Sequence, residues 1–287
     1  MYQTAIAGLF SIMFLLGACA VQIAQPLKTQ PREKSDQLVS LAHGIDESAG
    51  GVQSYIITTA AAIYYLEKAG GGLSSMLDPN GVDWIGFHRK PGSGHNGEYR
   101  GFPNAVHRQD GNFFHAMNAG TDASTSFVNI ETGNHVRITF TSGNGKWQGR
   151  YDFYPDRLDF TMSKVSPGHK YWIQYEGVPG GSMDDADFWY RSGDNKRHGI
   201  REDIEGDLPA PEWMAFGDPQ SARMLYMLNH GDDAQPDDYA NREPMTVFAF
   251  GRSGKEKFLT EPQKFSIGFV ESMDYAVVDR EIRRVLE

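Results

Sequence analysis

The chain has 287 residues, and its 37 acidic against 27 basic side chains give a formal net charge of -10. This charge argues against nucleic acid or an anionic lipid surface as the main partner, because both would repel the protein. The length is within the range of one large domain, and the 32 glycines and 17 phenylalanines are typical of a turn-rich β-protein with aromatic surfaces, which sugar binding would use.

Residues 1–18 are predicted to be an export signal peptide. Residues 5–16 form an uncharged apolar run that is too short for a transmembrane helix, which needs about 20 apolar residues. The motif LGAC at 16–19 resembles the lipobox of bacterial lipoproteins, and this resemblance implies that Cys19 is the lipid anchor of a periplasmic or outer-membrane lipoprotein. Simple secretion is the alternative. Cys19 is the only cysteine, so no intramolecular disulfide is possible.

Residues 19–54 are predicted to be a tether between the lipid anchor and the folded body. From residue 21 onward this stretch is polar and interrupted by prolines, as in QPLKTQPREKSDQ. The body at 55–287 is expected to be a single domain. The lipid anchor would then be its only contact with a membrane.

The body shows the pattern of an all-β protein, in which short β-rich runs alternate with turn residues. The turn sequence DPNG at 78–81 lies between two apolar runs and predicts a hairpin. Strands at such regular spacing predict a large antiparallel sandwich or barrel. Further strands are predicted at 125–130, 135–141, 147–154, 158–164, 169–176, 213–216, 222–230, 245–251 and 265–270.

Two segments of the body depart from this strand pattern. Residues 177–213 are acidic and rich in glycine, and they predict long loops. Residues 272–287 carry apolar side chains at near-helical spacing, which predicts one C-terminal helix packed on a sheet.

The segment YYLEKAGGGLSSMLD at 64–78, followed by Gly81, resembles the opening hairpin of galactose-mutarotase-like β-sandwiches. This fold occurs in aldose epimerases and in domains of several polysaccharide lyases. The later strand order and the closing run FSIGF at 265–269 are compatible with it across 55–287. The resemblance implies a large antiparallel β-sandwich and a carbohydrate substrate, and it leaves the reaction open.

The first candidate site lies in the glycine-studded segment 84–122, which contains four histidines. An arginine fork suits a carboxylate or sulfate, and a histidine suits proton transfer near neutral pH. The alternative is that these side chains satisfy backbone groups of a long loop. We predict His107 and His115 as catalytic residues and Arg100, Asn104 and Asn118 as substrate-binding residues.

The second candidate site lies on the predicted strand KYWIQYEG at 170–177. Strand alternation puts Lys170, Trp172, Gln174 and Glu176 on one face. Glu176 at the strand end could be a general base with a histidine as the acid, the pairing that aldose epimerases use. The structural alternative is an ion pair of Glu176 with Lys170 or Arg150.

No cofactor or metal is predicted. The acidic runs at 184–187 and 232–238 make calcium possible, but they lack EF-hand spacing, and a solvated acidic loop is the favoured interpretation. Zinc has no HExxH motif to support it, and a site built from His88, His95, His107 and His115 has no supporting spacing. The loop 184–211 is expected to border the site, with Trp189 and Tyr190 contacting sugar.

The main functional hypothesis is an exported enzyme that cleaves an acidic polysaccharide by β-elimination. In it, His107 or His115 takes the proton and Tyr151 or Tyr171 protonates the leaving oxygen. Hydrolysis or sugar epimerisation, with Glu176 and a histidine, is the enzymatic alternative.

The alternative from another class is a non-catalytic carbohydrate-binding lipoprotein. Its stacking surfaces would be the indole rings of Trp84, Trp147, Trp172 and Trp189. An enzyme needs polar groups that converge in a pocket, whereas a binder can use an open aromatic platform.

Overall fold

The computed structural model describes residues 38–87, 100–107, 109–116 and 123–287. Asp36–Glu287 forms one compact unit. The predictions on the signal peptide, Cys19, most of the tether, His88, His95 and Asn118 lie outside the described residues.

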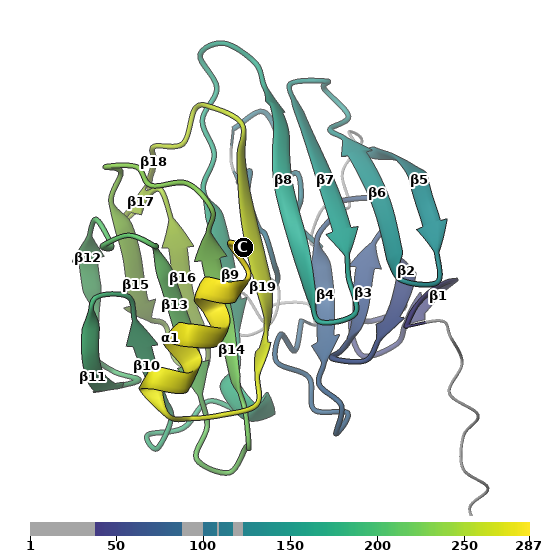
Figure 1. The fold of residues 1–287 in the computed structure, drawn as a ribbon. Helices are drawn as coiled ribbons and strands as arrows, with labels where there is room; N and C mark the ends of the chain where they lie inside the picture. Colours follow the sequence, from purple (N-terminus) through teal and green to yellow (C-terminus); the bar gives the residue numbers. More distant parts are fainter. Residues whose placement is uncertain (1–37, 88–99, 108, 117–122) are drawn as a thin grey trace, which may run out of the picture. The chain divides into compact units, whose positions relative to one another are not determined.

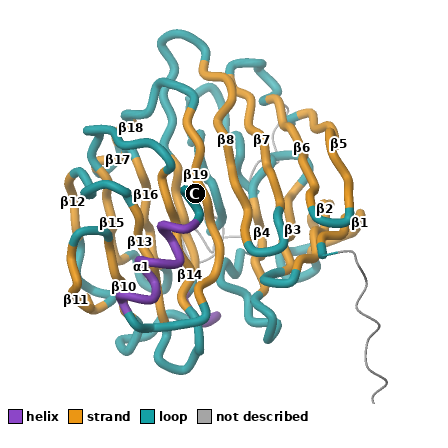
Figure 2. Tube along the Cα trace, in the orientation of Figure 1, coloured by secondary structure: helices purple, strands orange, loops and turns teal. Residues whose placement is uncertain are grey.

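The largest element is a nine-stranded antiparallel sheet (Figures 1 and 2). Its strand order is β11-β10-β13-β14-β19-β8-β7-β6-β5. The bounds are β11 Asp194–Gly199, β10 Phe188–Arg191, β13 Trp213–Gly217, β14 Met224–Asn229, β19 Gln263–Val270, β8 Arg157–Val165, β7 Trp147–Phe153, β6 His135–Thr141 and β5 Thr125–Thr132.

Two four-stranded sheets and one small hairpin complete the β-structure of the described residues. The first sheet has the order β1-β2-β3-β4 and the second β12-β15-β16-β9. Their bounds are β1 Val39–Asp46, β2 Val52–Thr59, β3 Ile63–Glu67, β4 Leu73–Leu77, β12 Ile204–Gly206, β15 Asp237–Asn241, β16 Thr246–Phe250 and β9 Ile173–Gly177. The hairpin pairs β17 Arg252–Ser253 with β18 Glu256–Lys257, and a 3-10 turn spans Pro179–Gly181.

Both four-stranded sheets pack on the same face of the nine-stranded sheet. Strand alternation places the aromatic side chains between the layers. The Tyr64 ring of β3 lies 5.2 Å from the Phe153 ring of β7, and the Tyr175 ring of β9 lies 5.5 Å from the Phe216 ring of β13. The predicted antiparallel β-sandwich is therefore confirmed.

The other face of the nine-stranded sheet carries α1 Tyr275–Arg284, which lies in front of β13 and β14 in Figure 1. Asp274 caps the helix by accepting a hydrogen bond from the Val277 amide. Val278 and Ile282 bury the apolar side of the helix in one cluster with Trp213. The predicted C-terminal helix is confirmed, and no helix within the described ranges is long and apolar enough to cross a membrane.

Two predicted boundaries differ from the structure. Residues 39–46 and 52–54, expected in the tether, form β1 and the start of β2. β1 is an edge strand that buries only its terminal residues Val39 and Asp46, so its sequence lacks the alternating apolar pattern of a core strand. The expected loops at 177–213 contain β10, β11 and β12. These strands are short, and the two buried aromatic residues of β10, Phe188 and Trp189, pack on opposite faces of the sheet, so no period-two pattern marks the strand in the sequence.

Candidate active site

A cavity of about 400 Å³ opens beside β9, a volume in the range of small-molecule sites. Gln174 and Glu176 of β9 line the cavity together with Trp172, which directly precedes the strand. The three side chains share one face, as strand alternation predicted. The remaining described lining residues are His107 and, from the β17–β18 hairpin and its turn, Arg252, Gly254, Lys255 and Lys257.

Backbone hydrogen bonds fix the segment 101–106 along the free edge of β9. The Gly101 amide donates to the Glu176 carbonyl at 2.7 Å, and the Glu176 amide donates back at 3.0 Å. Further along, the Gln174 amide donates to Pro103 O at 2.7 Å. The amide of Leu73 at the start of β4 donates to Phe102 O at 2.7 Å. The segment thus joins the two four-stranded sheets and carries Asn104 and His107 to the cavity.

The Glu176 carboxyl is the buried acid of the cavity, with 7% of the residue exposed. Its Oε2 accepts a hydrogen bond from Asn104 Nδ2 at 2.6 Å. Burial raises the pKa of Glu176 to about 7, and the Asn104 bond, the Arg252 charge and the Gln174 amide only partly offset this. A carboxyl that titrates near neutral pH is suited to general acid–base chemistry.

Asn104 is held in an unusual backbone conformation that aims its amide at Glu176. Its φ is 40°, a region in which asparagine is one of the better tolerated residues after glycine. Its carbonyl accepts a hydrogen bond from Trp172 Nε1 at 2.7 Å. Contacts to the residue before β9 and to the Glu176 carboxyl therefore help to hold Asn104 in place.

Gly101→Ala is expected to damage this arrangement. Gly101 has a φ of 154°, and a Cβ there would lie 2.6 Å from Asn104 Oδ1 and 3.0 Å from the Leu73 carbonyl. We expect a loss of about 1–3 kcal/mol in unfolding free energy, together with weaker activity. Gly145→Ala is the matched control, because its φ is also positive while its Cβ would meet nothing within 4 Å. Equal losses in both variants would contradict a special constraint at Gly101.

His107 and His115 lie together, with their ring centroids 6.2 Å apart. His107 lines the cavity, whereas His115 is 2% exposed and lies behind it. Burial and the His107 charge lower the pKa of His115 to about 3, so His115 stays neutral at physiological pH. Of the two predicted catalytic histidines, the geometry favours His107 as the one that meets a substrate.

The cations of the cavity come from a part of the chain that sequence reasoning missed. Arg252 and Lys257 lie 5.5 Å and 4.4 Å from the Trp172 ring centroid. Lys257 Nζ also donates to the His107 carbonyl at 2.6 Å. The run GRSGKEK at 251–257 is rich in cations and contains turn glycines at the end of a predicted strand. This pattern could have indicated a cationic turn beside the site.

Arg100 was predicted to bind substrate, but the structure gives it a structural contact. Its Nη1 donates to the Gly86 carbonyl at 3.0 Å. Among the described residues that line the cavity, Arg100 does not occur. The next residue, Gly101, pairs with Glu176 of β9, so this segment supports the site through its backbone rather than through Arg100.

The two tyrosines proposed as acids are engaged elsewhere. The Tyr171 hydroxyl donates to the Glu261 carbonyl at 2.7 Å, and the Tyr151 hydroxyl donates to the Gly71 carbonyl. Burial raises the pKa of both Tyr171 and Tyr151 far above the ordinary value. Neither ring is found among the described lining residues, so the structure does not support the acid role that β-elimination assigned to them.

Trp189 and Tyr190 lie on opposite faces of strand β10 rather than on a sugar-binding loop. The Trp189 ring stacks on His198 at 3.9 Å between ring centroids, and Trp189 is fully buried. The Tyr190 hydroxyl donates to the Met273 carbonyl, and its ring packs against Tyr275 of α1. Their predicted contact with sugar is not supported by these positions.

The open aromatic platform of the binder hypothesis is also not supported by the structure. The chain has five tryptophans, all described, and each is at most 6% exposed: Trp84, Trp147, Trp172, Trp189 and Trp213.

The predicted alternative for Glu176, an ion pair with Lys170 or Arg150, is not supported by the structure. Arg150 pairs with Asp152 at 2.9 Å, and Lys170 lies over the Phe258 ring.

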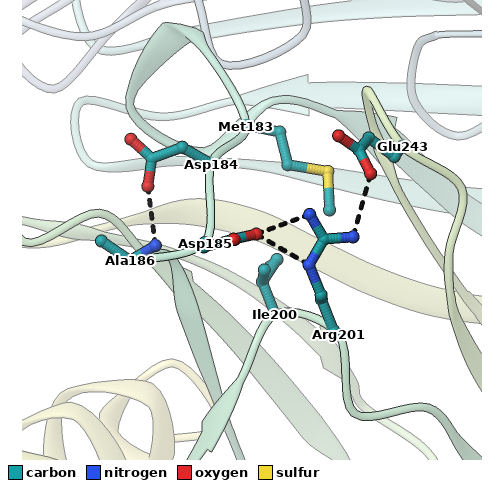
Figure 3. A pocket seen from close by; sticks show the side chains of 7 residues that line it. All are labelled: Met183, Asp184, Asp185, Ala186, Ile200, Arg201 and Glu243. Carbon is teal, nitrogen blue, oxygen red and sulfur yellow. Dashed lines mark hydrogen bonds and ion pairs between the residues drawn. The ribbon is translucent and has the colours of Figure 1, made fainter.

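A second cavity, of about 560 Å³, lies at the loop 183–186 and is shown in Figure 3. The Arg201 guanidinium is bound there by Asp185 at 2.7 Å and by Glu243 at 2.9 Å (Figure 3). The lining has one guanidinium and three carboxyl groups, and its two ion pairs are exposed. We therefore take the first cavity, with its buried carboxyl, as the candidate site. The predicted loop 184–211 contributes to this second cavity and to none of the described lining of the Glu176 cavity.

The acidic runs do not form a metal centre in the described part of the chain. No group of three or more histidine, cysteine, aspartate or glutamate residues there is placed to hold an ion. Asp184 accepts a hydrogen bond from the Ala186 amide at 2.7 Å, and Asp187 accepts one from the Asp184 amide at 2.8 Å. These acids stabilise their own loop.

The solved structures that are similar to this chain include two that are named as enzymes of sugar chemistry. A putative aldose 1-epimerase from Escherichia coli K12 has 7% identity and a TM-score of 0.47, with 81% of this chain and 99% of that chain covered. A galactose mutarotase related enzyme from Lactobacillus acidophilus has 9% identity and a TM-score of 0.45, with 77% and 99% covered.

At identities of 7% and 9% and TM-scores below 0.5, these similarities carry no conclusion about the family or activity of this chain. No protein-family model matches the sequence. No curated protein matches it either.

Proposed function

We propose that this protein is a carbohydrate-active enzyme of the sugar epimerase type, with Glu176 as general base and His107 as its acid partner. The observation that carries the proposal is the cavity beside β9, where a buried carboxyl with a pKa of about 7 and a histidine share the lining. A base and an acid in one small cavity are what proton transfer to and from a bound sugar requires.

The proposed reaction interconverts the two anomers of a sugar. Glu176 takes the proton of the C1 hydroxyl, His107 gives a proton to the ring oxygen, and the C1–ring oxygen bond breaks to leave the open-chain aldehyde. Rotation about the C1–C2 bond and the reverse proton transfers close the ring with the other configuration. Atoms and charges balance without a cofactor.

Two further polar groups support a sugar as the ligand. Gln174 is 5% exposed and lines the cavity, and its Oε1 accepts no hydrogen bond within the described ranges. A buried acceptor without a partner costs free energy, and a sugar hydroxyl would satisfy it. Asn104 holds the carboxyl in place while the sugar turns.

The competing reactions are less well supported by the geometry. Glycoside hydrolysis uses a pair of carboxyl groups, and Glu176 is the one carboxyl among the described lining residues. β-Elimination lacks the tyrosine acid, since Tyr151 and Tyr171 donate to backbone carbonyls outside the cavity.

Exchange NMR spectroscopy of anomers tests the proposal. The purified protein is mixed with an equilibrated panel of aldoses and uronic acids, and exchange between the two anomeric proton signals is measured. We expect at least one sugar to exchange about tenfold faster than in buffer. Tight binding without faster exchange for any sugar would contradict the proposal and favour a non-catalytic binder.

We also propose that the protein is exported and lipid-anchored through Cys19, which the motif LGAC at 16–19 and the polar sequence after it support. Cys19→Ser is expected to move the protein from the membrane fraction to the soluble fraction of cells. Ala18→Gly, which keeps a small residue before the cysteine, is the matched control. A wild-type chain that is already soluble and lacks a lipid would contradict the anchor.

A further inference from the structure

The cavity beside β9 has an excess of positive charge on one side. Three cations, Arg252, Lys255 and Lys257, line it from the β17–β18 hairpin, against the carboxyl of Glu176 among the described lining residues. The chain as a whole carries a formal net charge of -10. A local cationic edge in an acidic protein points to a ligand with negative charge.

Arg252 is the decisive residue of this edge, because it is buried and only partly satisfied. It is 7% exposed, and its Nε donates to the Gly254 carbonyl at 2.8 Å. Asp238 faces the same Nε at 3.6 Å. Its Nη1 is buried and has no hydrogen-bond partner among the residues that the structure describes. A buried guanidinium nitrogen without an acceptor is costly, and a ligand oxygen would satisfy it.

Trp172 fixes the cations in position. The Lys257 ammonium lies 4.4 Å from its ring centroid and the Arg252 guanidinium 5.5 Å, both within the range of cation–π contacts. The indole Nε1 donates to Asn104 O at 2.7 Å, so the ring itself is anchored. Because charged groups cover the ring, this edge selects a ligand by charge rather than by stacking.

We propose that the edge formed by Arg252, Lys255 and Lys257 binds the anionic group of an acidic sugar. The group is a carboxylate, sulfate or phosphate, whose oxygens share the geometry that an arginine fork recognises. The inference rests on the proposed function, because it names the substrate class of the same cavity. Asp238 compensates part of the Arg252 charge and holds the guanidinium, while Nη1 faces the ligand.

The test compares matched acidic and neutral sugars by isothermal titration calorimetry. The pairs are glucuronate with glucose, galacturonate with galactose, and glucose 6-sulfate or glucose 6-phosphate with glucose, so that the three anionic groups are distinguished. We expect the acidic member of at least one pair to bind about tenfold tighter. Raising the ionic strength should reduce this ratio.

Variants assign the preference to the cationic edge. Arg252→Gln should bring the affinity ratio close to one, and Lys255→Ala, at an exposed position, should reduce it in part. Arg201→Gln is the matched control, since Asp185 and Glu243 already bind this arginine in the second cavity. If Arg252→Gln does not fold, Lys257→Met together with Lys255→Ala replaces it.

Each outcome decides between the proposals. Equal affinity for acidic and neutral sugars, or a preference that survives in folded Arg252→Gln, would overturn the anion-binding role of the cationic edge. The absence of binding by every sugar and by inorganic sulfate and phosphate would overturn it as well. Glu176→Gln should keep the preference for the acidic sugar. Anomer exchange that is absent while the preference is present would refute only the enzymatic role.

Discussion

Glu176→Gln is expected to lower the rate of anomer exchange by about 10²- to 10⁴-fold, the usual contribution of a general base. Glutamine keeps the shape of the side chain and can still accept the Asn104 Nδ2 hydrogen bond, which spans 2.6 Å in the wild type. It removes only the ability to take a proton. Exchange NMR at saturating sugar separates this effect from a loss of binding.

The same variant should be at least as stable as the wild type at pH 8. Burial raises the pKa of Glu176 from 4.5 to about 7, so the folded state resists ionisation of this carboxyl. The stability that the protonated form confers is fully present below the unfolded pKa and is lost as pH rises through about 7. That loss amounts to about 3 kcal/mol at most. A Glu176→Gln variant that unfolds far more easily at pH 8 would contradict the burial of an unfavourable charge.

Arg223→Ala is expected to produce the largest loss of stability, about 3 kcal/mol in the free energy of unfolding. Arg223 Nη1 contacts Asp78 Oδ2 at 2.6 Å, and the two side chains are 7% and 2% exposed. Burial alone would raise the pKa of Asp78, but hydrogen bonds from the Val82 amide and from Arg223 outweigh it and the pKa is lowered. Removing the arginine leaves a buried carboxylate without its cation.

This pair matters for the site because Asp78 and Arg223 join the turn after β4 to β14 of the nine-stranded sheet. Trp84, in the segment after that turn, accepts hydrogen bonds at its carbonyl from the Tyr175 hydroxyl and the Val178 amide at the end of β9. Arg284→Ala is the matched control. Its exposed pair with Glu281 should contribute about 0–1 kcal/mol in chemical denaturation. Similar losses in the two variants would contradict the larger contribution expected of the buried Asp78 pair.

The fold and one face of the site could be predicted from the sequence because their signals are local. Period-two alternation placed Trp172, Gln174 and Glu176 on a common face, and all three line the cavity. Near-helical spacing predicted the C-terminal helix, where Val278 and Ile282 are buried. Turn chemistry at 78–81 predicted a turn in which the Gly81 amide donates to the Asp78 carbonyl at 2.8 Å.

The partners within the site could not be predicted, because they come from distant parts of the chain. Asn104 and Glu176 are 72 positions apart, and Lys257 and His107 are 150 apart. Anion binding was predicted for Arg100, an arginine of the histidine-rich segment 84–122, although Arg252 lines the cavity. Trp189 was misplaced for a related reason. It lies in a segment rich in acids and glycines, but strand pairing in β10 places its ring on His198.

The pH dependence of anomer exchange is the most direct test of the claim that Glu176 is the base. With a pKa of about 7 in the free protein, the ionised base is present above that pH, and its fraction falls tenfold per pH unit below it. We expect kcat/KM to decline on the acid side with a midpoint near 7, and Glu176→Gln to lose this limb with its activity. A midpoint near 4.5, or exchange that does not depend on pH between about 5 and 8, would contradict the account.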